Sequence, residues 1–459
     1  MYAALHGLTK TRQLPLIQER TISMTGSRRF APDILFPKDW TSHHMTRAFR
    51  YRNYRLFFTG QTVSLVGLWM QRVAMSWLIY RLTNSSLHLG LVDFAGQIPV
   101  LFLGFFAGAL LEKWDLRRTI MLCQMLSMVQ ALLLAVLTLT GTVAYWHVLL
   151  LSVFLGIINA FDIPARQAFV VQMVDRPEDV GNAIALNSSL FNTARLVGPS
   201  LAGVVIALVG EGLCFLANGL SYGASLLALW IMRIAPRKEE ERNDAESMKS
   251  RISEGIRYAW GNPPIRAILL VLVLISLCGL PYLVMLPVFA RDILHGGPKS
   301  LGFLLGATGI GTLIASLRLA MRPSPVGLGK VLGISVCLFG ASVTLFSASR
   351  WFPLSFLLMG CIGFGMVSLL VSCNTLLQVL VDEDKRSRVM SLYTISILGI
   401  SPFGSLLTGW LASHFGAPLT LGCGGVFCIL GGVLFLRNHP RLWAYASKIY
   451  RAKGLLPRE

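Results

Sequence analysis

Three ionisable side chains lie within long apolar runs of this 459-residue sequence, where each charge needs a physical explanation. Arg72 and Asp93 stand about ten residues on either side of a polar turn near Thr83. On two antiparallel helices that rise about 1.5 Å per residue, this spacing places both about 15 Å below one surface. An unpaired charge at that depth in a membrane costs several kcal/mol. We therefore predict that Arg72 and Asp93 pair and that Asp93 is a proton-coupling site; a purely structural ion pair is the alternative.

A third charge, Arg195, lies in the middle of a later apolar run, with Asn187 and Asn192 on the preceding turns. A guanidinium here would suit an anionic or catecholate-like substrate, or it would hydrogen-bond amide and carbonyl groups between helices. Glutamines add hydrogen-bonding groups to the first apolar runs, among them Gln61 and Gln97. We take these five residues as candidates for lining a substrate cavity.

The composition indicates that lipid is the solvent around these side chains. Hydrophobic residues make up 54% of the chain and charged residues 14%, and the mean hydropathy is +0.62. Twelve apolar runs are each long enough for a membrane-spanning helix. All eight cysteines lie in such runs, and none stands at metal-ligand spacing with a histidine. We expect no disulfide framework, no bound metal and no cofactor.

The basic residues predict the orientation in the membrane. Of the 41 Lys and Arg residues, the segments on one side of the twelve runs contain only Arg81, Arg291, Lys299 and Arg350. Basic residues are retained on the cytoplasmic side, so we predict a multi-pass plasma-membrane protein with both termini in the cytoplasm. The net charge of +19 then reflects topology, and we expect no nucleic-acid partner. The predicted parts are a cytoplasmic tail (1–55), a six-helix bundle (56–232), a charged cytoplasmic linker (233–264), a second six-helix bundle (265–436) and a cytoplasmic tail (437–459).

One apolar stretch occurs twice, first as Asn182–Gly210 and again as Arg388–Gly416. Alignment without gaps pairs Gly203 with Gly409, and small residues at helical spacing allow two helices to pack closely. Because the copies fall in the fifth and eleventh runs, we predict two six-helix bundles related by an axis along the membrane normal.

A short loop between the second and third runs combines a glycine with acidic and basic residues. Such a loop can hold neighbouring helix ends through charge pairs and helix dipoles and release them when bundles move; a loop that only sets orientation is the alternative. Asp162 and Arg166, at i and i+4, can pair, and Glu112 and Arg166 are candidate partners across a gate. The candidates for this cytoplasmic gate are Gly108, Glu112, Lys113, Asp115, Arg117, Arg118, Asp162 and Arg166.

The loop that begins at Gly108 resembles the signature loop of the major facilitator superfamily. Two departures matter: Glu112 stands where that family has Asp, and Asp115 and Leu116 replace its Gly-Arg pair. The extra methylene of Glu112 is expected to loosen the latch.

The fifth run is similar to the motif of exporting, proton-antiporting members of that superfamily, with Ala in place of Gly at two positions. Pro199 removes a backbone donor, and Gly198 and Gly203 allow close packing, so we predict a hinge at these residues; ordinary helix packing is the alternative. The phrase from Asn159 to Gln167 is similar to the branch that contains the enterobactin exporter, also called transmembrane secretion effectors or drug:proton antiporter-3 proteins.

This resemblance implies an all-α polytopic membrane protein with twelve transmembrane helices in two six-helix bundles. It also implies a secondary active transporter of the bacterial inner membrane that exports a small amphipathic compound, siderophore-like or drug-like, by proton-coupled alternating access. We expect a monomer whose partners are the small-molecule substrate, protons and the lipid bilayer.

The sequence also bears on three other classes of function. An importer, or a non-transporting receptor or scaffold on the same fold, is the alternative to an exporter. The stretch Gly219-Leu-Ser221-Tyr-Gly223 matches a nucleophile elbow, but it lies inside an apolar run rather than at a strand–turn–helix junction, so we do not expect an enzyme.

Overall fold

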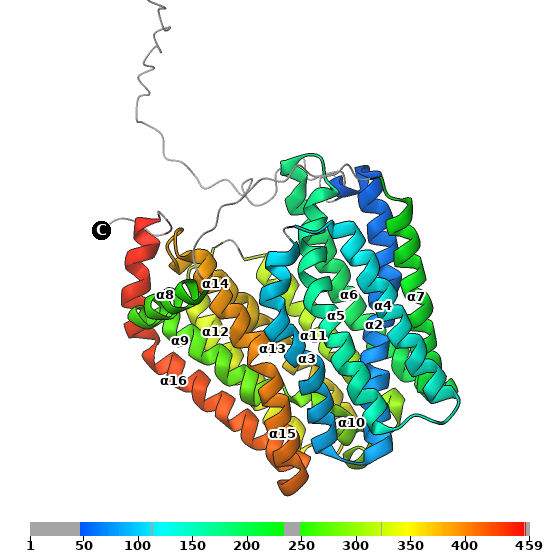
Figure 1. Ribbon diagram of the computed structural model, residues 1–459. Helices are drawn as coiled ribbons and strands as arrows, with labels where there is room; N and C mark the ends of the chain where they lie inside the picture. The colour runs from blue at the N-terminus through cyan, green and yellow to red at the C-terminus, as the bar shows by residue number, and fades with distance from the viewer. Residues whose placement is uncertain (1–45, 112, 234–247, 323, 454, 456–459) are drawn as a thin grey trace, which may run out of the picture. The chain divides into compact units, whose positions relative to one another are not determined.

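The computed structural model describes residues 46–111, 113–233, 248–322, 324–453 and 455, and these residues are helical almost throughout, without a β-strand (Figure 1). Twelve helical segments among them are long and apolar enough to cross a membrane. The predicted fold class, an all-α polytopic membrane protein, is therefore confirmed. Most of the predicted N-terminal tail, part of the linker, and Glu112 lie outside the described residues.

The first half contains six spans, and a short helix, η2 (Arg47–Arg50), precedes them. Successive spans run in opposite directions. We call the face where α2 begins and α7 ends the linker face, and the face with the short turns 84–85, 140–144 and 210 the turn face. The spans are α2 (Arg52–Thr83), α3 (Ser86–Leu111), α4 (Leu116–Leu139), α5 (Tyr145–Gln172), α6 (Pro177–Val209) and α7 (Glu211–Ile231).

The second half contains the other six spans, two of them interrupted by π-helical turns. The seventh span comprises α9 (Pro263–Leu274), η3 (Ile275–Gly279), α10 (Tyr282–Val288) and η4 (Phe289–Ile293). The eleventh comprises α14 (Arg386–Thr394), η5 (Ile395–Gly399) and α15 (Ser401–Phe415). The remaining spans are α11 (Pro298–Ala320), α12 (Leu328–Ala348), α13 (Phe352–Leu380) and α16 (Ala417–Ala452).

The two copies of the repeated stretch end in the same way. Gly210 after α6 and Gly416 after α15 both have φ of 85°, a conformation that glycine adopts without a Cβ clash. Each permits a one-residue connection to the next span. The copies differ in the middle, because α6 is continuous, whereas η5 precedes Pro402 in the second copy.

The last helix differs from the sequence prediction. We predicted that the final span ends at 436 and that a tail follows, but α16 continues as one helix to Ala452. Ala446 and Tyr450 are buried on one side of this extension, while Arg437, Arg441 and Lys448 are exposed on the other. Packing of an apolar stripe against the second half therefore keeps the basic segment helical.

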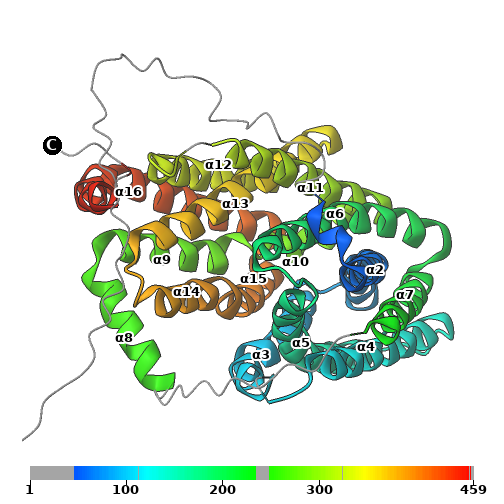
Figure 2. The ribbon, with the colours of Figure 1, turned by 90° about the horizontal axis from the view of Figure 1, so that it is seen from above.

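The halves touch backbone to backbone near the turn face. Helix α6 packs on α11, and α3 packs on α15 (Figure 2). A Cβ added to Gly203 would lie 2.8 Å from the Pro298 carbonyl oxygen, and one added to Gly90 would lie 2.5 Å from the Ser405 carbonyl oxygen. Only residues without a side chain permit this approach. Small residues therefore close the turn face.

Gly302→Ala tests this closure. The new methyl would lie 2.7 Å from the Pro199 carbonyl oxygen, so α6 and α11 must separate, at a cost of about 1–3 kcal/mol. Gly223→Ala is the matched control, because nothing lies within 4 Å of a Cβ there. Both changes raise helix propensity equally. We expect a lower unfolding temperature in lipid nanodiscs for Gly302→Ala alone; equal temperatures for the two variants would contradict the close contact.

Helix α8 (Met248–Gly261) is bound by ion pairs to the loop between α13 and α14, beside which it lies in Figure 2. The Lys385 Nζ atom lies 2.5 Å from Glu254 Oε1, and Arg388 donates to Glu254 Oε2. The Tyr258 hydroxyl donates to Asp382 Oδ2 at 2.8 Å. The hydrogen bond from Lys385 holds the pKa of Glu254 below its usual range, and Glu254 raises the pKa of Lys385. This segment of the linker is therefore fixed to the second half.

Glu254→Gln should loosen α8 at neutral pH. Because the pKa of Glu254 is lowered, its contribution is present above the ordinary glutamate pKa and is lost as pH falls through the lowered value. The variant should therefore speed hydrogen–deuterium exchange in residues 253–261 at neutral pH, and the difference from wild type should shrink in acid. Glu383→Gln, whose side chain is 89% exposed, is the control. Exchange unchanged by Glu254→Gln would show that the ion pairs do not hold α8.

Candidate substrate and proton site

Trp69 lies beside two arginines from different helices near the middle of the first half. The Arg72 Cζ atom lies 4.9 Å from the centre of the Trp69 ring, and the Arg195 Cζ atom lies 5.7 Å from it. Trp69 and Arg72 are one turn apart on α2, while Arg195 comes from α6. A Cβ added to Gly198 would lie 2.6 Å from Trp69 Cβ, so this glycine brings α6 close to α2. The aromatic face stabilises both guanidinium groups.

Apolar side chains surround this pair of arginines. Phe191 and Trp69 make an edge-to-face ring contact with centroids 5.7 Å apart. The Arg195 Nη2 atom lies 3.9 Å from Met366 Sδ on α13 in the second half. Arg195 therefore connects the halves. Asn187 is half-buried and Asn192 is exposed on α6.

Asp93 does not form the predicted ion pair with Arg72. Its Oδ2 atom instead accepts a hydrogen bond of 2.6 Å from Gln97, one turn along α3. Asp93 also interacts with Arg72 and with the Ser405 hydroxyl on α15. The prediction of direct pairing was wrong because a neighbouring amide already binds the carboxylate and Trp69 already stabilises the guanidinium. As the predicted depths imply, Asp93 and Arg72 are close enough to interact electrostatically.

The Arg72 side chain is not enclosed by the surrounding helices. This side chain is exposed, and Asp93, Trp69 and Arg195 are half-buried. The groups that interact with Arg72 come from three other helices, α3, α6 and α7. Its exposed atoms therefore face the interior of the half. A hydrated environment at mid-depth lowers the cost of keeping these charges in a membrane protein.

The structure brings three of the predicted residues together nearer the linker face. Arg166 Nε lies 2.6 Å from Asp162 Oδ2, and the two side chains are only 15% and 13% exposed. A second nitrogen of Arg166 donates to the Gln61 side-chain oxygen. Gln61 is therefore bound at this ion pair rather than at Trp69. The predicted partnership of Arg166 with Glu112 involves a residue outside the described part of the chain.

The loop after α3 makes its described contacts within the first half. Asp115 caps α4 by accepting the Arg118 backbone N–H at 2.8 Å. Arg117 donates to the Leu229 and Trp230 carbonyls at 2.8 and 2.9 Å, at the end of α7, where a cation is favourable. These residues join α4 to α7. Lys113 is exposed, and a Cβ at Gly108 would meet nothing within 4 Å.

A latch of side chains joins the two halves at the turn face, and the sequence analysis does not predict it. The Tyr80 hydroxyl donates to Asp292 Oδ2, and Arg291 donates to Asn84 Oδ1 at 2.7 Å. Arg291 also stacks on Tyr80, with its Cζ atom 5.7 Å from the ring. The available signal was Asp292 directly after Arg291 at the end of the seventh apolar run. The sequence analysis uses Arg291 only for orientation and does not consider Asp292.

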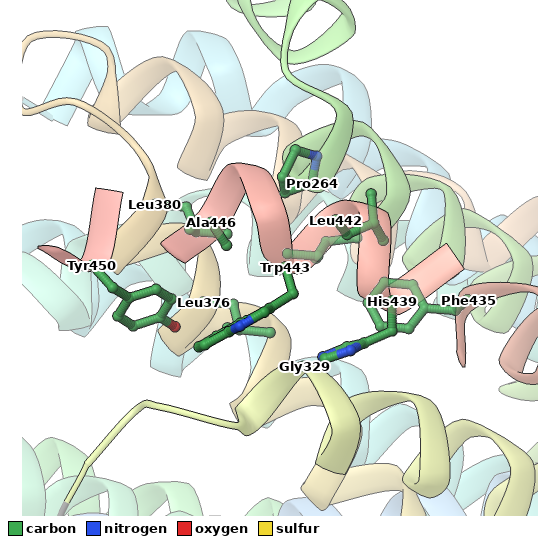
Figure 3. A pocket seen from close by; sticks show the side chains of 11 residues that line it. Pro264, Gly329, Leu376, Leu380, Phe435, His439, Leu442, Trp443, Ala446 and Tyr450 are labelled. Atoms are coloured by element: carbon green, nitrogen blue, oxygen red, sulfur yellow. The ribbon is translucent and has the colours of Figure 1, made fainter. Parts of the chain in front are cut away.

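The pocket in Figure 3 lies elsewhere. It is lined by residues of α9, α12, α13 and α16, including Pro264, Gly329 and Tyr450. Helices α2, α3 and α6, which contribute the arginines and Asp93, do not line it. His439 and Trp443 stack in it with rings 6.3 Å apart. We therefore do not assign it as the substrate site.

Twelve membrane-spanning helices in two six-helix halves, with ionisable groups at mid-depth in the first half, define a membrane transporter of the major facilitator type. The model of the transmembrane secretion effector family matches residues 45–453, and the chain belongs to that family.

The relatives of this chain are transporters, not enzymes. It is 26% identical over 383 residues to the staphyloferrin A transporter of Staphylococcus aureus, a match that covers 83% of this chain and 95% of the relative. It is 26% identical over 354 residues to the multidrug efflux pump Tap of Mycolicibacterium fortuitum, covering 76% and 86%.

Solved structures share the fold at low sequence identity. The peptide transporter POT in complex with sulfate has a TM-score of 0.70 and 13% identity, covering 86% of this chain and 96% of that one. A bacterial homolog of the human lysosomal transporter Spinster, inward-facing and occupied, has a TM-score of 0.67 and 13% identity, covering 88% and 98%. At such identities the likeness shows the fold alone.

Tyr80→Phe tests the turn-face latch. Loss of a hydrogen bond to a charged acceptor costs about 1.5–3 kcal/mol, roughly tenfold or more in the opening equilibrium. We expect faster hydrogen–deuterium exchange in residues 84–92 and 283–296. Tyr145→Phe is the matched control, because Tyr145 begins α5 at the same face and packs on His88 instead. Similar exchange in both variants would mean that the latch does not hold the halves.

Proposed function

We propose that this protein exports a small amphipathic compound, siderophore-like or drug-like, by proton-coupled alternating access in the bacterial inner membrane. The observation that carries the proposal is the half-buried carboxylate of Asp93, at mid-depth beside Arg72 and in contact with Ser405 of the other half. An ionisable residue at that depth is by default a hypothesis for a functional site. We propose that the protein acts as a monomer with both termini in the cytoplasm.

The contacts between the halves support an inward-facing state. The Gly203–Gly302 and Gly90–Gly409 approaches and the Tyr80–Asp292 hydrogen bond all lie toward the turn face. The distribution of Lys and Arg favours the cytoplasm for the linker face. With the outer side closed in this way, a compound would enter from the cytoplasm.

The charge on Asp93 links proton binding to the movement of the halves. Ionised and neutral Asp93 differ by one charge beside Arg72 and at the contact between α3 and α15. Uptake or release of one proton therefore changes the energy of that contact. Because α3 and α15 also meet at Gly90 and Gly409, the same change biases closure of the turn face.

Trp69, Phe191 and Met366 supply an apolar wall for the compound, and Arg195 supplies a hydrogen-bond donor. This combination suits a molecule with an apolar body and an acceptor group. The transport functions of both named relatives favour a transporter over a receptor or scaffold. The efflux function of Tap favours export over import.

Proton flux in proteoliposomes tests this proposal. Under an imposed pH gradient, a panel of siderophore-like and drug-like compounds should include at least one that drives proton movement through the wild-type protein. Asp93→Asn should abolish that flux, because the amide cannot carry the proton. Asp175→Asn, an exposed acid after α5, is the control and should leave flux unchanged. Undiminished proton flux through Asp93→Asn would remove Asp93 from the coupling path. Failure of every compound in the panel to drive proton flux through the wild-type protein would contradict transport.

A further inference from the structure

The interiors of the two halves differ in chemistry. Among the described residues, every buried amide or carboxylate side chain belongs to the first half. The buried polar groups of the second half are hydroxyls and His439. Amide groups that are buried without full pairing carry a large desolvation cost. The first half must offset this cost, and its polar interior therefore needs a physical explanation.

Part of that interior is a hydrogen-bond network of side chains. Asn218 donates to Gln71 at 2.8 Å, Gln71 donates to Gln130 at 2.9 Å, and Ser221 donates to the Asn218 side-chain oxygen at 3.2 Å. A Cβ at Gly67 would lie 2.6 Å from the Asn218 side-chain oxygen, so this glycine brings α2 onto α7. The network joins α2, α4 and α7 immediately beside Arg72.

Other buried polar atoms of the first half have no hydrogen-bond partner in the described chain. Both the oxygen and the nitrogen of the Gln124 amide are buried and unpaired, as is Asp162 Oδ1. Cys123, adjacent to Gln124, interacts electrostatically with Asp162 and Arg166. Buried polar atoms that lack a protein partner are the groups to which buried water binds.

Tyr222 connects this cluster to the centre of the half. It is buried on α7 and interacts with Asn218 and Ser127 as well as with Asp162 and Arg166. Arg72 in turn interacts with Tyr222 and with Asp93. Polar groups therefore lie in succession from Asp93 at mid-depth to the Asp162–Arg166 pair nearer the linker face.

We propose that this succession is a hydrated proton route within the first half, with Asp162 as a second proton-carrying carboxylate and Gln124 and Tyr222 holding the bridging water. The proposal rests on the proton coupling proposed above and extends it to the path by which a proton leaves Asp93. Each transfer breaks one O–H bond and forms the next, from the Asp93 carboxyl through water to Asp162 and then to water at the linker face.

The surroundings of Asp162 control its proton. Arg166 lies on the same helix, Gln61 faces from α2, Cys123 from α4 and Tyr222 from α7. Arg166 is the one cation among these groups, and Gln61 binds it as well. A proton on Asp162 would leave Arg166 with Gln61 as its partner, so the site can be neutralised without leaving the guanidinium unbound.

Hydroxyl-radical footprinting of the full chain in nanodiscs tests the hydration, with water as the probe. A buried tyrosine is labelled quickly only where water is bound beside it. Wild-type Tyr222 should be labelled severalfold faster than Tyr54, which is also buried but donates its hydroxyl to the Ala183 carbonyl at 2.9 Å. Gln124→Leu should reduce Tyr222 labelling severalfold, and Gln124→Met provides the same test if the first variant folds poorly. Equal labelling of Tyr222 and Tyr54 would overturn the route.

Infrared difference spectroscopy on lowering the pH tests the second carboxylate. Wild type should show a protonated-carboxyl band that is absent in Asp162→Asn and restored in shifted form in Asp162→Glu, while Asp93→Asn retains it. A spectrum unchanged by Asp162→Asn would overturn the role of Asp162. Neither measurement requires a transported compound. A dry Tyr222 would therefore refute this route without bearing on transport. Absent proton flux would refute the proposed function, and with it the proton role of the route, but not its hydration.

Discussion

The cost of placing ionisable and amide groups inside a membrane is the constraint on which this structure depends. Each such group must be paired, stacked on an aromatic ring or hydrated. In the first half, Arg166 is paired with Asp162, Arg72 and Arg195 stack on Trp69, and the Arg72 side chain is exposed between helices. The second half avoids the cost with a core of apolar residues and hydroxyls. We infer that the first half contains the charged groups and that the second half mainly moves relative to the first.

Part of the contact between the halves is made by backbone atoms without intervening side chains. Glycines on α6, α11, α3 and α15 bring backbones together near the turn face, and the Tyr80–Asp292 latch adds a hydrogen bond that can break. Backbone contacts of this kind gain dispersion energy without interlocking side chains. The same region includes Ser405 beside Asp93, so the contact that must open lies next to the group that we propose titrates.

The spans and the class of fold could be predicted because lipid imposes length and hydropathy on every helix. The partner of Arg72 could not be predicted in this way. It depends on whether Trp69 or Asp93 lies closer to the guanidinium after the helices pack. The extension of α16 was missed because its apolar stripe lies among basic residues and becomes recognisable only against the second half. The pair of Asp162 and Arg166 is a local i, i+4 contact, and the structure does place these side chains together. The roles of these residues in transport remain predictions.

We propose that the charge on Asp93 sets which face of the molecule is closed. Spin-label distances test it most directly, with one pair at the turn face (Thr142→Cys and Arg350→Cys) and one at the linker face (Arg176→Cys and Glu383→Cys), after replacement of the eight native cysteines. All four positions are exposed, and each pair spans the two halves. On acidification the distance should change in opposite directions at the two faces, and Asp93→Asn should hold one state at every pH. Distances that do not respond to pH, or that respond equally in Asp93→Asn, would contradict the account.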